Sequence, residues 1–136
     1  MVADLPSLLI TDDDPSFRET LQGLFEHRGF RTYAACDGEE ALKIVRRETV
    51  HLALFDMHMP RLNGLDAIRR LKEFHLEFPC ILLSAEADDH LIAEAREAHV
   101  FDVLRKPVSR DRVINVVQMA MDAGYGPGMW PTAFGS

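Results

Sequence analysis

The chain has 136 residues, of which 47% are hydrophobic and 27% are charged, and its net charge is −7 at neutral pH. This length and this mixture predict one globular domain with a core of its own. The acidic balance argues against nucleic acid or an anionic membrane as partner of this segment, and no apolar stretch approaches the ~18 residues that span a bilayer.

Short apolar runs alternate with amphipathic stretches along the chain. Residues 7–11 are almost continuously apolar, which is typical of a strand buried on both faces. Asp14 can cap the helix that follows, Pro15 suits its first position, and Gly29 marks its end. In chain order, the expected strands are residues 7–11, 30–35, 51–55, 79–83 and 101–104. The expected helices run from Pro15 to before Gly29, from Gly38 to about Glu48, from Gly64 beyond Leu71, from Asp88 or Asp89 to about Ala98, and from Ser109 to Asp122.

Strict alternation of five strand–helix units predicts an α/β fold, in which a doubly wound parallel sheet carries helices on both faces and forms three layers. Residues 124–136 are rich in Gly and Pro and lack periodicity. We therefore expect the folded domain to span residues 1–123 and the remainder to be a tail or a linker stub. For Trp130 and Phe134 in this segment, disorder, packing onto the domain and docking on a partner all stay open.

The two cysteines, Cys36 and Cys80, form no CxxC pair and lie at the edges of apolar runs. We expect both to be buried, reduced thiols, which fits a cytoplasmic location. The first residues lack a basic region and contain only a short apolar run, so we expect no signal peptide.

Polar residues whose side chains can bind ligands or react follow the ends of the expected strands. Asp12 and Asp13 follow the first strand, Asp56 the third, Ser84 the fourth and Lys106 the fifth. The carboxyl ends of parallel strands share one edge of the sheet, and ligands bind in the crevice there. The sequence therefore predicts that three carboxylates, a hydroxyl and an ammonium meet in one pocket.

The charges in this pocket indicate a metal-assisted reaction. Two carboxylates ~4 Å apart repel each other by about 1–4 kcal/mol at effective dielectric constants of 80 to 20, so three of them favour a bound cation. Oxygen ligands in an open crevice suit Mg²⁺, with Mn²⁺ as an alternative, and the sequence lacks the Cys or His pattern of a zinc site. Beside such an ion, Asp56 can attack a phosphoryl group whose oxygens Lys106 and Ser84 contact, giving an acyl phosphate.

Four segments, TDDDPSFRETL, LALFDMHMPRLNGLDAIRRLK, CILLSAEAD and FDVLRKPVS, resemble in order and spacing the signatures of response regulator receiver domains, the CheY-like superfamily of two-component signalling. The ordered set of DD, D-x-x-M-P-x-x-x-G, S-A and K-P is specific, and the resemblance extends from Leu8 to Met121. It implies a flavodoxin-like (βα)5 fold with strand order 2-1-3-4-5.

The resemblance also implies roles for individual residues. Asp56 matches the phosphoacceptor, Asp13 the principal carboxylate ligand of the metal, and Asp12 an assisting ligand that often acts through water. His58 holds the position whose backbone carbonyl binds the metal, and Glu86 holds a position that, with His58, tunes the lifetime of the acyl phosphate. Glu86 either orients an attacking water or stays solvated, and both readings stay open.

Ser84 matches the switch hydroxyl and Lys106 the phosphate-binding lysine, whose bond to Pro107 is typically cis in this family. Two positions depart from the family pattern. Val103 stands where an aromatic side chain usually moves inward on activation, which puts an aromatic switch there in doubt. His99 and Val100 replace the usual Gly-Ala pair before the fifth strand, which indicates an unusual loop or partner surface.

The family resemblance implies that a histidine kinase or a histidine phosphotransfer protein donates the phosphoryl group and docks near the first helix. The added charge would shift the face formed by the fourth helix, fifth strand and fifth helix, and a homodimer through that face is compatible with this. An aspartate-dependent phosphohydrolase is an alternative, but no cap-sized insertion is present and no carboxylic acid follows Asp56 by two residues. An interaction module that has lost phosphorylation is a third, although the acceptor and the lysine are both present.

Overall fold

The computed structural model describes residues 5–127, in which five strands and five helices alternate. The strands are β1 (Ser7–Thr11), β2 (Arg31–Ala35), β3 (Leu52–Asp56), β4 (Cys80–Ser84) and β5 (Asp102–Arg105). The helices are α1 (Pro15–His27), α2 (Gly38–Arg47), α3 (Gly64–Glu73), α4 (Asp89–Glu97) and α5 (Arg110–Tyr125). Every expected element is present, with boundaries that differ by a few residues.

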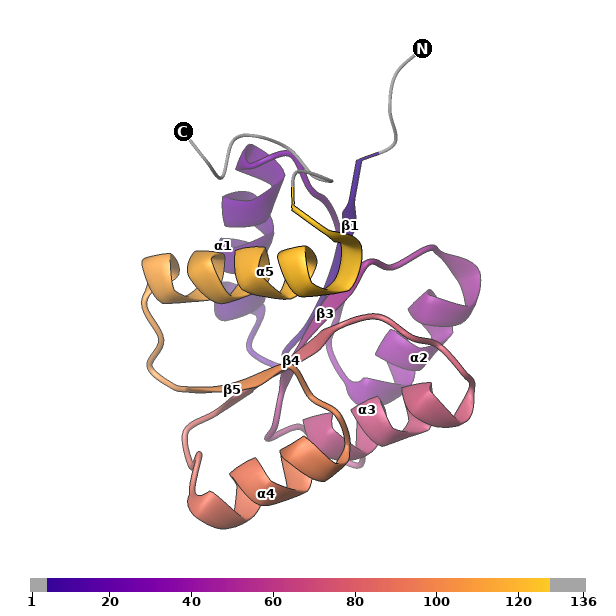
Figure 1. Ribbon diagram of the computed structural model, residues 1–136, viewed down its shortest axis with the longest axis vertical. Coiled ribbons are helices and arrows are strands. Elements are labelled where there is room, and N and C mark those ends of the chain that lie inside the picture. The colour runs from indigo at the N-terminus through magenta and orange to yellow at the C-terminus, as the bar shows by residue number, and fades with distance from the viewer. Residues whose placement is uncertain (1–4, 128–136) are drawn as a thin grey trace.

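All strand pairs are parallel, and the sheet order is β2-β1-β3-β4-β5. This confirms the predicted α/β fold and its strand order. Figure 1 shows α1 and α5 on one face of the sheet and α2, α3 and α4 on the other. An apolar cluster fills the space between the sheet and each set of helices. The central strands β1, β3 and β4 are buried along their whole length, so their ends are held rigidly.

Each helix begins at a polar side chain that accepts hydrogen bonds from backbone N–H groups of the first turn. As expected, Asp14 caps α1, accepting from the N–H groups of Ser16 at 3.0 Å and Phe17 at 3.4 Å. Of the two candidates for α4, Asp88 is the cap and accepts from the N–H of Leu91. The other three caps are Asp37, Asn63 and Ser109.

The last helix is longer than expected, because α5 continues past Asp122 to Tyr125. The Tyr125 ring packs edge-on against His51, and its hydroxyl donates a hydrogen bond to the His51 carbonyl. These contacts hold a turn that the low helix propensity of Gly124 disfavours. The predicted tail therefore contributes its first residues to the helix, while Trp130 and Phe134 lie outside the described residues.

Two local features qualify what the sequence suggested. The expectation that both cysteines are buried is wrong for Cys36, which is exposed in the link between β2 and α2, whereas Cys80 is buried. His99, in the loop before β5, has φ of 59°, a left-handed conformation that favours glycine. Glycine adopts this conformation without strain, which accounts for the glycine that the family usually has there.

Within residues 5–127, no helix is both long and apolar enough to cross a membrane.

Candidate metal and phosphoacceptor site

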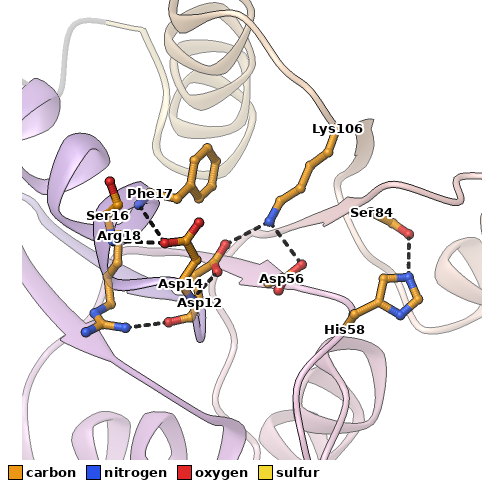
Figure 2. Close-up of polar contacts among 9 residues, drawn as sticks. All are labelled: Asp12, Asp14, Ser16, Phe17, Arg18, Asp56, His58, Ser84 and Lys106. Carbon is orange, nitrogen blue, oxygen red and sulfur yellow. Dashed lines mark hydrogen bonds and ion pairs between the residues drawn. The ribbon is translucent and has the colours of Figure 1, made fainter.

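Side chains from the carboxyl ends of β1, β3 and β5 meet at one edge of the sheet (Figure 2). The Lys106 ammonium lies 2.9 Å from Asp12 Oδ2 and 3.2 Å from Asp56 Oδ1. Asp12 and Asp56 are both buried, at 2% and 6% residue exposure, and the Lys106 side chain is one-quarter exposed. Residues far apart in the sequence therefore form one charged cluster with limited access to water.

A third carboxylate completes the cluster. Asp12, Asp13 and Asp56 each place a carboxylate oxygen within 4.8 Å of the others, and Asp13 is exposed. One ammonium compensates only part of three negative charges, and every oxygen in the group is a hard ligand. The cluster could therefore hold a metal ion, and its donor set fits a divalent cation that prefers oxygen.

The surroundings of Asp56 raise the pKa of its carboxyl. Burial raises the pKa of the Asp56 carboxyl, the charge of Asp12 raises it further, and the Lys106 ammonium offsets only part of this. For Lys106, burial alone would lower the pKa, but the hydrogen bond and charge of Asp12, together with Asp56, leave it raised. Lys106 therefore stays an ammonium at neutral pH, and a bound cation would relieve the repulsion between Asp56 and Asp12.

The loop after β3 is held against the strand by a close backbone approach. A Cβ atom on Gly64 would overlap the Asp56 carbonyl oxygen and lie 2.8 Å from Leu82 Cδ1, so only glycine fits there. The Gly64 N–H donates to the Met57 carbonyl at 3.1 Å, which closes the loop. Met59, within this loop, is buried. The backbone that carries Asp56 is therefore fixed from both sides.

Ser84 and His58 lie on the other side of Asp56 from Asp12 in Figure 2. Ser84 is completely buried, its Oγ lies 3.4 Å from His58 Nε2, and it accepts a hydrogen bond from the Glu86 N–H at 3.1 Å. Which of the Ser84 and His58 atoms donates depends on the imidazole tautomer. Ser84 ends β4, the strand that pairs with β3, and its hydroxyl contacts the His58 ring and the Glu86 backbone.

The first turn of α1 makes two contacts with the site that the sequence did not predict. The Arg18 guanidinium donates to the Asp12 carbonyl at 2.7 Å, and the Phe17 ring centroid lies 4.5 Å from Lys106 Nζ. Phe17 lies in the first turn of this helix. Its contact with Lys106 joins segments that are distant in the chain, so no local pattern could reveal it. The Lys106–Pro107 bond is cis, as the family resemblance implied.

Comparison with known proteins gives a consistent answer. Residues 8–118 match the family model of the response regulator receiver domain. Sporulation initiation phosphotransferase F of Bacillus subtilis is 30% identical over 111 residues, which cover 82% of this chain and 90% of that protein. Regulatory protein AtoC of Escherichia coli is 31% identical over 84% of this chain, but the match spans only 25% of AtoC.

A solved structure supports the same relationship. The receiver domain of the Francisella response regulator 1452 is 30% identical, with a TM-score of 0.81, and the match covers 87% of this chain and 98% of that one. The role known for this family is phosphorylation on an aspartate followed by a change of conformation, which makes its members signalling switches rather than classical enzymes. Motif order, sheet order and these matches agree, and the chain belongs to the response regulator receiver domain family of two-component signalling.

Proposed function

We propose that Asp56 accepts a phosphoryl group from a phosphohistidine in a reaction that requires Mg²⁺. The observation that carries this proposal is the ammonium of Lys106 within hydrogen-bonding reach of both Asp12 and Asp56, at the edge of the acidic cluster. Receiver domains interact with histidine kinases or phosphotransfer proteins, and we assign the donor to one of these classes. Two reduced thiols, Cys36 and Cys80, fit a cytoplasmic place of action.

The metal is assigned to Asp13, Asp12 and Asp56, with the backbone carbonyl of His58 as a further ligand. Mg²⁺ suits this set because it binds through one or two carboxylates and keeps several waters, and Mn²⁺ accepts similar ligands. When bound, the ion supplies positive charge that offsets the repulsion between Asp56 and an incoming phosphoryl group. Asp13 is the exposed member of the cluster, which suits a ligand that meets the ion at the surface.

The protein's own groups account for the other requirements of the transfer. An Asp56 carboxylate oxygen forms a bond to phosphorus, while the bond from phosphorus to the donor imidazole nitrogen breaks and leaves its electron pair on that nitrogen. Lys106 pairs with one phosphoryl oxygen, and Ser84 donates a hydrogen bond to another. Ser84 must turn away from His58 to do so, because its Oγ faces the His58 ring before the reaction.

The movement of Ser84 and Lys106 would couple the site to the face formed by α4, β5 and α5. Shifting a two-state equilibrium from 1:99 to 99:1 takes about 5.5 kcal/mol, which a few charge-assisted hydrogen bonds can supply. Val103 on β5 is a half-buried aliphatic residue packed against the core, so an aromatic rotamer change at this position plays no part. The same face is the proposed surface for a homodimer, and it exposes Ile92 and Met119.

Intact mass spectrometry after incubation with acetyl phosphate tests the proposal. We expect wild type to gain one phosphoryl mass in the presence of Mg²⁺, and Asp56→Ala to gain none, because the attacking oxygen is absent. Equal labelling of both proteins would refute the assignment of Asp56. Turnover of small phosphomonoesters, which a phosphohydrolase would show, is expected to be absent.

A further inference from the structure

The Phe17 ring, in the first turn of α1, faces the ammonium of Lys106, which follows β5 (Figure 2). The ring centroid lies 4.5 Å from Lys106 Nζ. This is within the ~6 Å over which an aromatic face attracts a cation. Phe17 is half-buried and packs against the apolar cluster under α1 and α5, so its ring has a fixed place beside the site.

The geometry around Lys106 leaves a distinct role for this ring. The ammonium has three N–H donors, and two of its neighbours are carboxylate oxygens at 2.9 Å, on Asp12, and 3.2 Å, on Asp56. The aromatic ring occupies a further side of the same ammonium. A lysine side chain has four rotatable bonds and is readily hydrated, so without a third contact its head group would sample solvent. The ring replaces water on that side by a surface that attracts positive charge.

We infer that Phe17 is a positioning residue for Lys106, which holds the ammonium over the phosphoacceptor before the phosphoryl group arrives. The inference rests on the proposed function, because it takes Lys106 to be the group that pairs with the phosphoryl oxygen. The backbone that carries the ring is itself held, since the Phe17 N–H is one of the two that Asp14 caps. A lysine held in place loses less freedom when it binds the phosphoryl group, which speeds the transfer.

A pair of variants separates this role from simple packing. Phe17→Leu keeps an apolar side chain but removes the aromatic face, whereas Phe17→Tyr keeps it. We expect Phe17→Leu to label with acetyl phosphate about two- to fivefold more slowly than wild type in Mg²⁺. Phe17→Tyr is expected to label within about twofold of wild type. Thermal melts of both variants establish that each is folded under the conditions of the assay.

A spectroscopic readout on the unphosphorylated protein tests the contact without any reaction. In ¹³C–¹H spectra, protons next to Nζ of Lys106 should be shifted upfield by the Phe17 ring current relative to those of the other lysines. The shift should disappear in Phe17→Leu and persist in Phe17→Tyr. Phe74→Leu is the matched control, because the Phe74 ring contacts the Arg46 guanidinium at 4.1 Å in another part of the molecule. That variant should change neither the Lys106 signal nor the labelling rate.

The outcomes distinguish the inference from the proposed function. Loss of the upfield shift together with slower labelling in Phe17→Leu would support the positioning role. The positioning role would be overturned if folded Phe17→Leu labelled at the wild-type rate, or if the Lys106 chemical shift were the same in Phe17→Leu as in wild type. If wild type itself fails to label while the Lys106 signal responds to Phe17, the contact exists and the proposed function is what fails.

Discussion

Asp12 connects three parts of the chain through separate atoms. Its Oδ2 accepts from Lys106 at 2.9 Å, its Oδ1 accepts from the Asp14 N–H at 2.9 Å, and its carbonyl accepts from Arg18 at 2.7 Å. Both carboxylate oxygens thus already have protein donors. This favours Asp13, which is exposed, as the carboxylate with the greater freedom to approach a metal ion.

Thr11, the residue before this acidic pair, has a buried hydroxyl with no hydrogen-bond partner among the described residues. A buried unsatisfied polar group costs about 1–3 kcal/mol, and valine has the same shape without the hydroxyl. We expect Thr11→Val to stabilise the protein by about 1 kcal/mol, or roughly 3–6 °C in Tm. Calorimetric melts check this, with Thr11→Ser as control, which keeps the hydroxyl and should be less stable. A lower Tm for Thr11→Val would contradict the reading.

The positions of the candidate site residues were predictable where topology alone decides them. The positions of Asp12, Asp56, Ser84 and Lys106 at strand ends follow from a parallel sheet, so their convergence could be expected before any coordinates. The contact of Phe17 could not, because it depends on the side-chain rotamers of two distant segments. Periodicity says which face of a helix is buried, but it does not say which atom lies opposite.

At the scale of elements, two glycines in helices have opposite surroundings. Gly23, inside α1, has nothing within 4 Å of the place where a Cβ would stand, whereas Gly64 begins α3 against the Asp56 carbonyl. Gly23→Ala should stabilise the protein by about 0.5–1 kcal/mol, because alanine loses less backbone freedom. Gly64→Ala should destabilise it by about 1–3 kcal/mol, because the strand end or α3 must move.

Urea denaturation of the two variants measures both effects in one comparison. Gly64→Ala should also slow labelling by acetyl phosphate, since the backbone that carries Asp56 is displaced, while Gly23→Ala should leave the labelling chemistry unaltered. Equal stabilities for Gly64→Ala and wild type would show that the close approach is not a constraint.

The start of α2 gives a dependence of stability on pH. The pKa of the Asp37 carboxyl is lowered, first by its hydrogen bond from the Glu40 N–H and further by the Arg61 guanidinium. A lowered folded-state pKa means that the charge stabilises the protein above the ordinary value near 3.8, and that this contribution is lost as pH falls through the lower folded value. Arg61 is largely exposed, so solvent screens its share.

Asp37→Asn removes the charge and keeps an oxygen that can cap the helix. We expect the variant to be less stable than wild type by about 0.5–1 kcal/mol at pH 7, with the difference shrinking below pH ~4 as wild-type Asp37 becomes protonated. Melts of both proteins between pH 3 and 7 give the comparison. A difference that stays constant over this range would rule out the charge as its source.

The ends of elements were the least predictable feature at this scale. The composition of residues 124–136 suggested a tail from Gly124 onward, yet α5 includes Gly124 and Tyr125. The reason is tertiary: Tyr125 packs on His51, a residue that local sequence cannot connect with it. The end of β2 also differs from the prediction, which expected Cys36 to be buried. Ala35 is the buried residue at the end of this strand, and the Cys36 thiol that follows it is exposed.

At the scale of the whole molecule, the sheet separates two apolar cores and places the acidic cluster and Lys106 at one edge. The number of strands, their parallel arrangement and the edge that carries the acidic cluster followed from alternation of strands and helices. The strand order came from the family resemblance rather than from periodicity, because a pattern of burial does not say which strands are neighbours. Because the edge is built from the ends of the central strands, a metal ion that binds there should affect the stability of the entire domain.

Metal binding to the unphosphorylated protein should appear as thermal stabilisation. We expect Tm to rise with millimolar Mg²⁺ and to return on addition of EDTA, since an ion at ten times its Kd adds about 1.4 kcal/mol to the folded state. Asp13→Asn should lose most of this response, because an amide carries no charge for the ion. Asp111→Asn, at an exposed carboxylate of α5 outside the cluster, should keep it. An undiminished response in Asp13→Asn would exclude Asp13 as a ligand.

Locating the phosphoryl group within the chain tests directly whether Asp56 is the phosphoacceptor. Protein labelled by acetyl phosphate can be reduced with borohydride, which converts an aspartyl phosphate to homoserine, and then sequenced by tandem mass spectrometry. We expect homoserine at position 56 only, in amounts that depend on Mg²⁺ and fall sharply in Lys106→Met. Homoserine at another aspartate, or at position 56 in equal yield with EDTA, would contradict it.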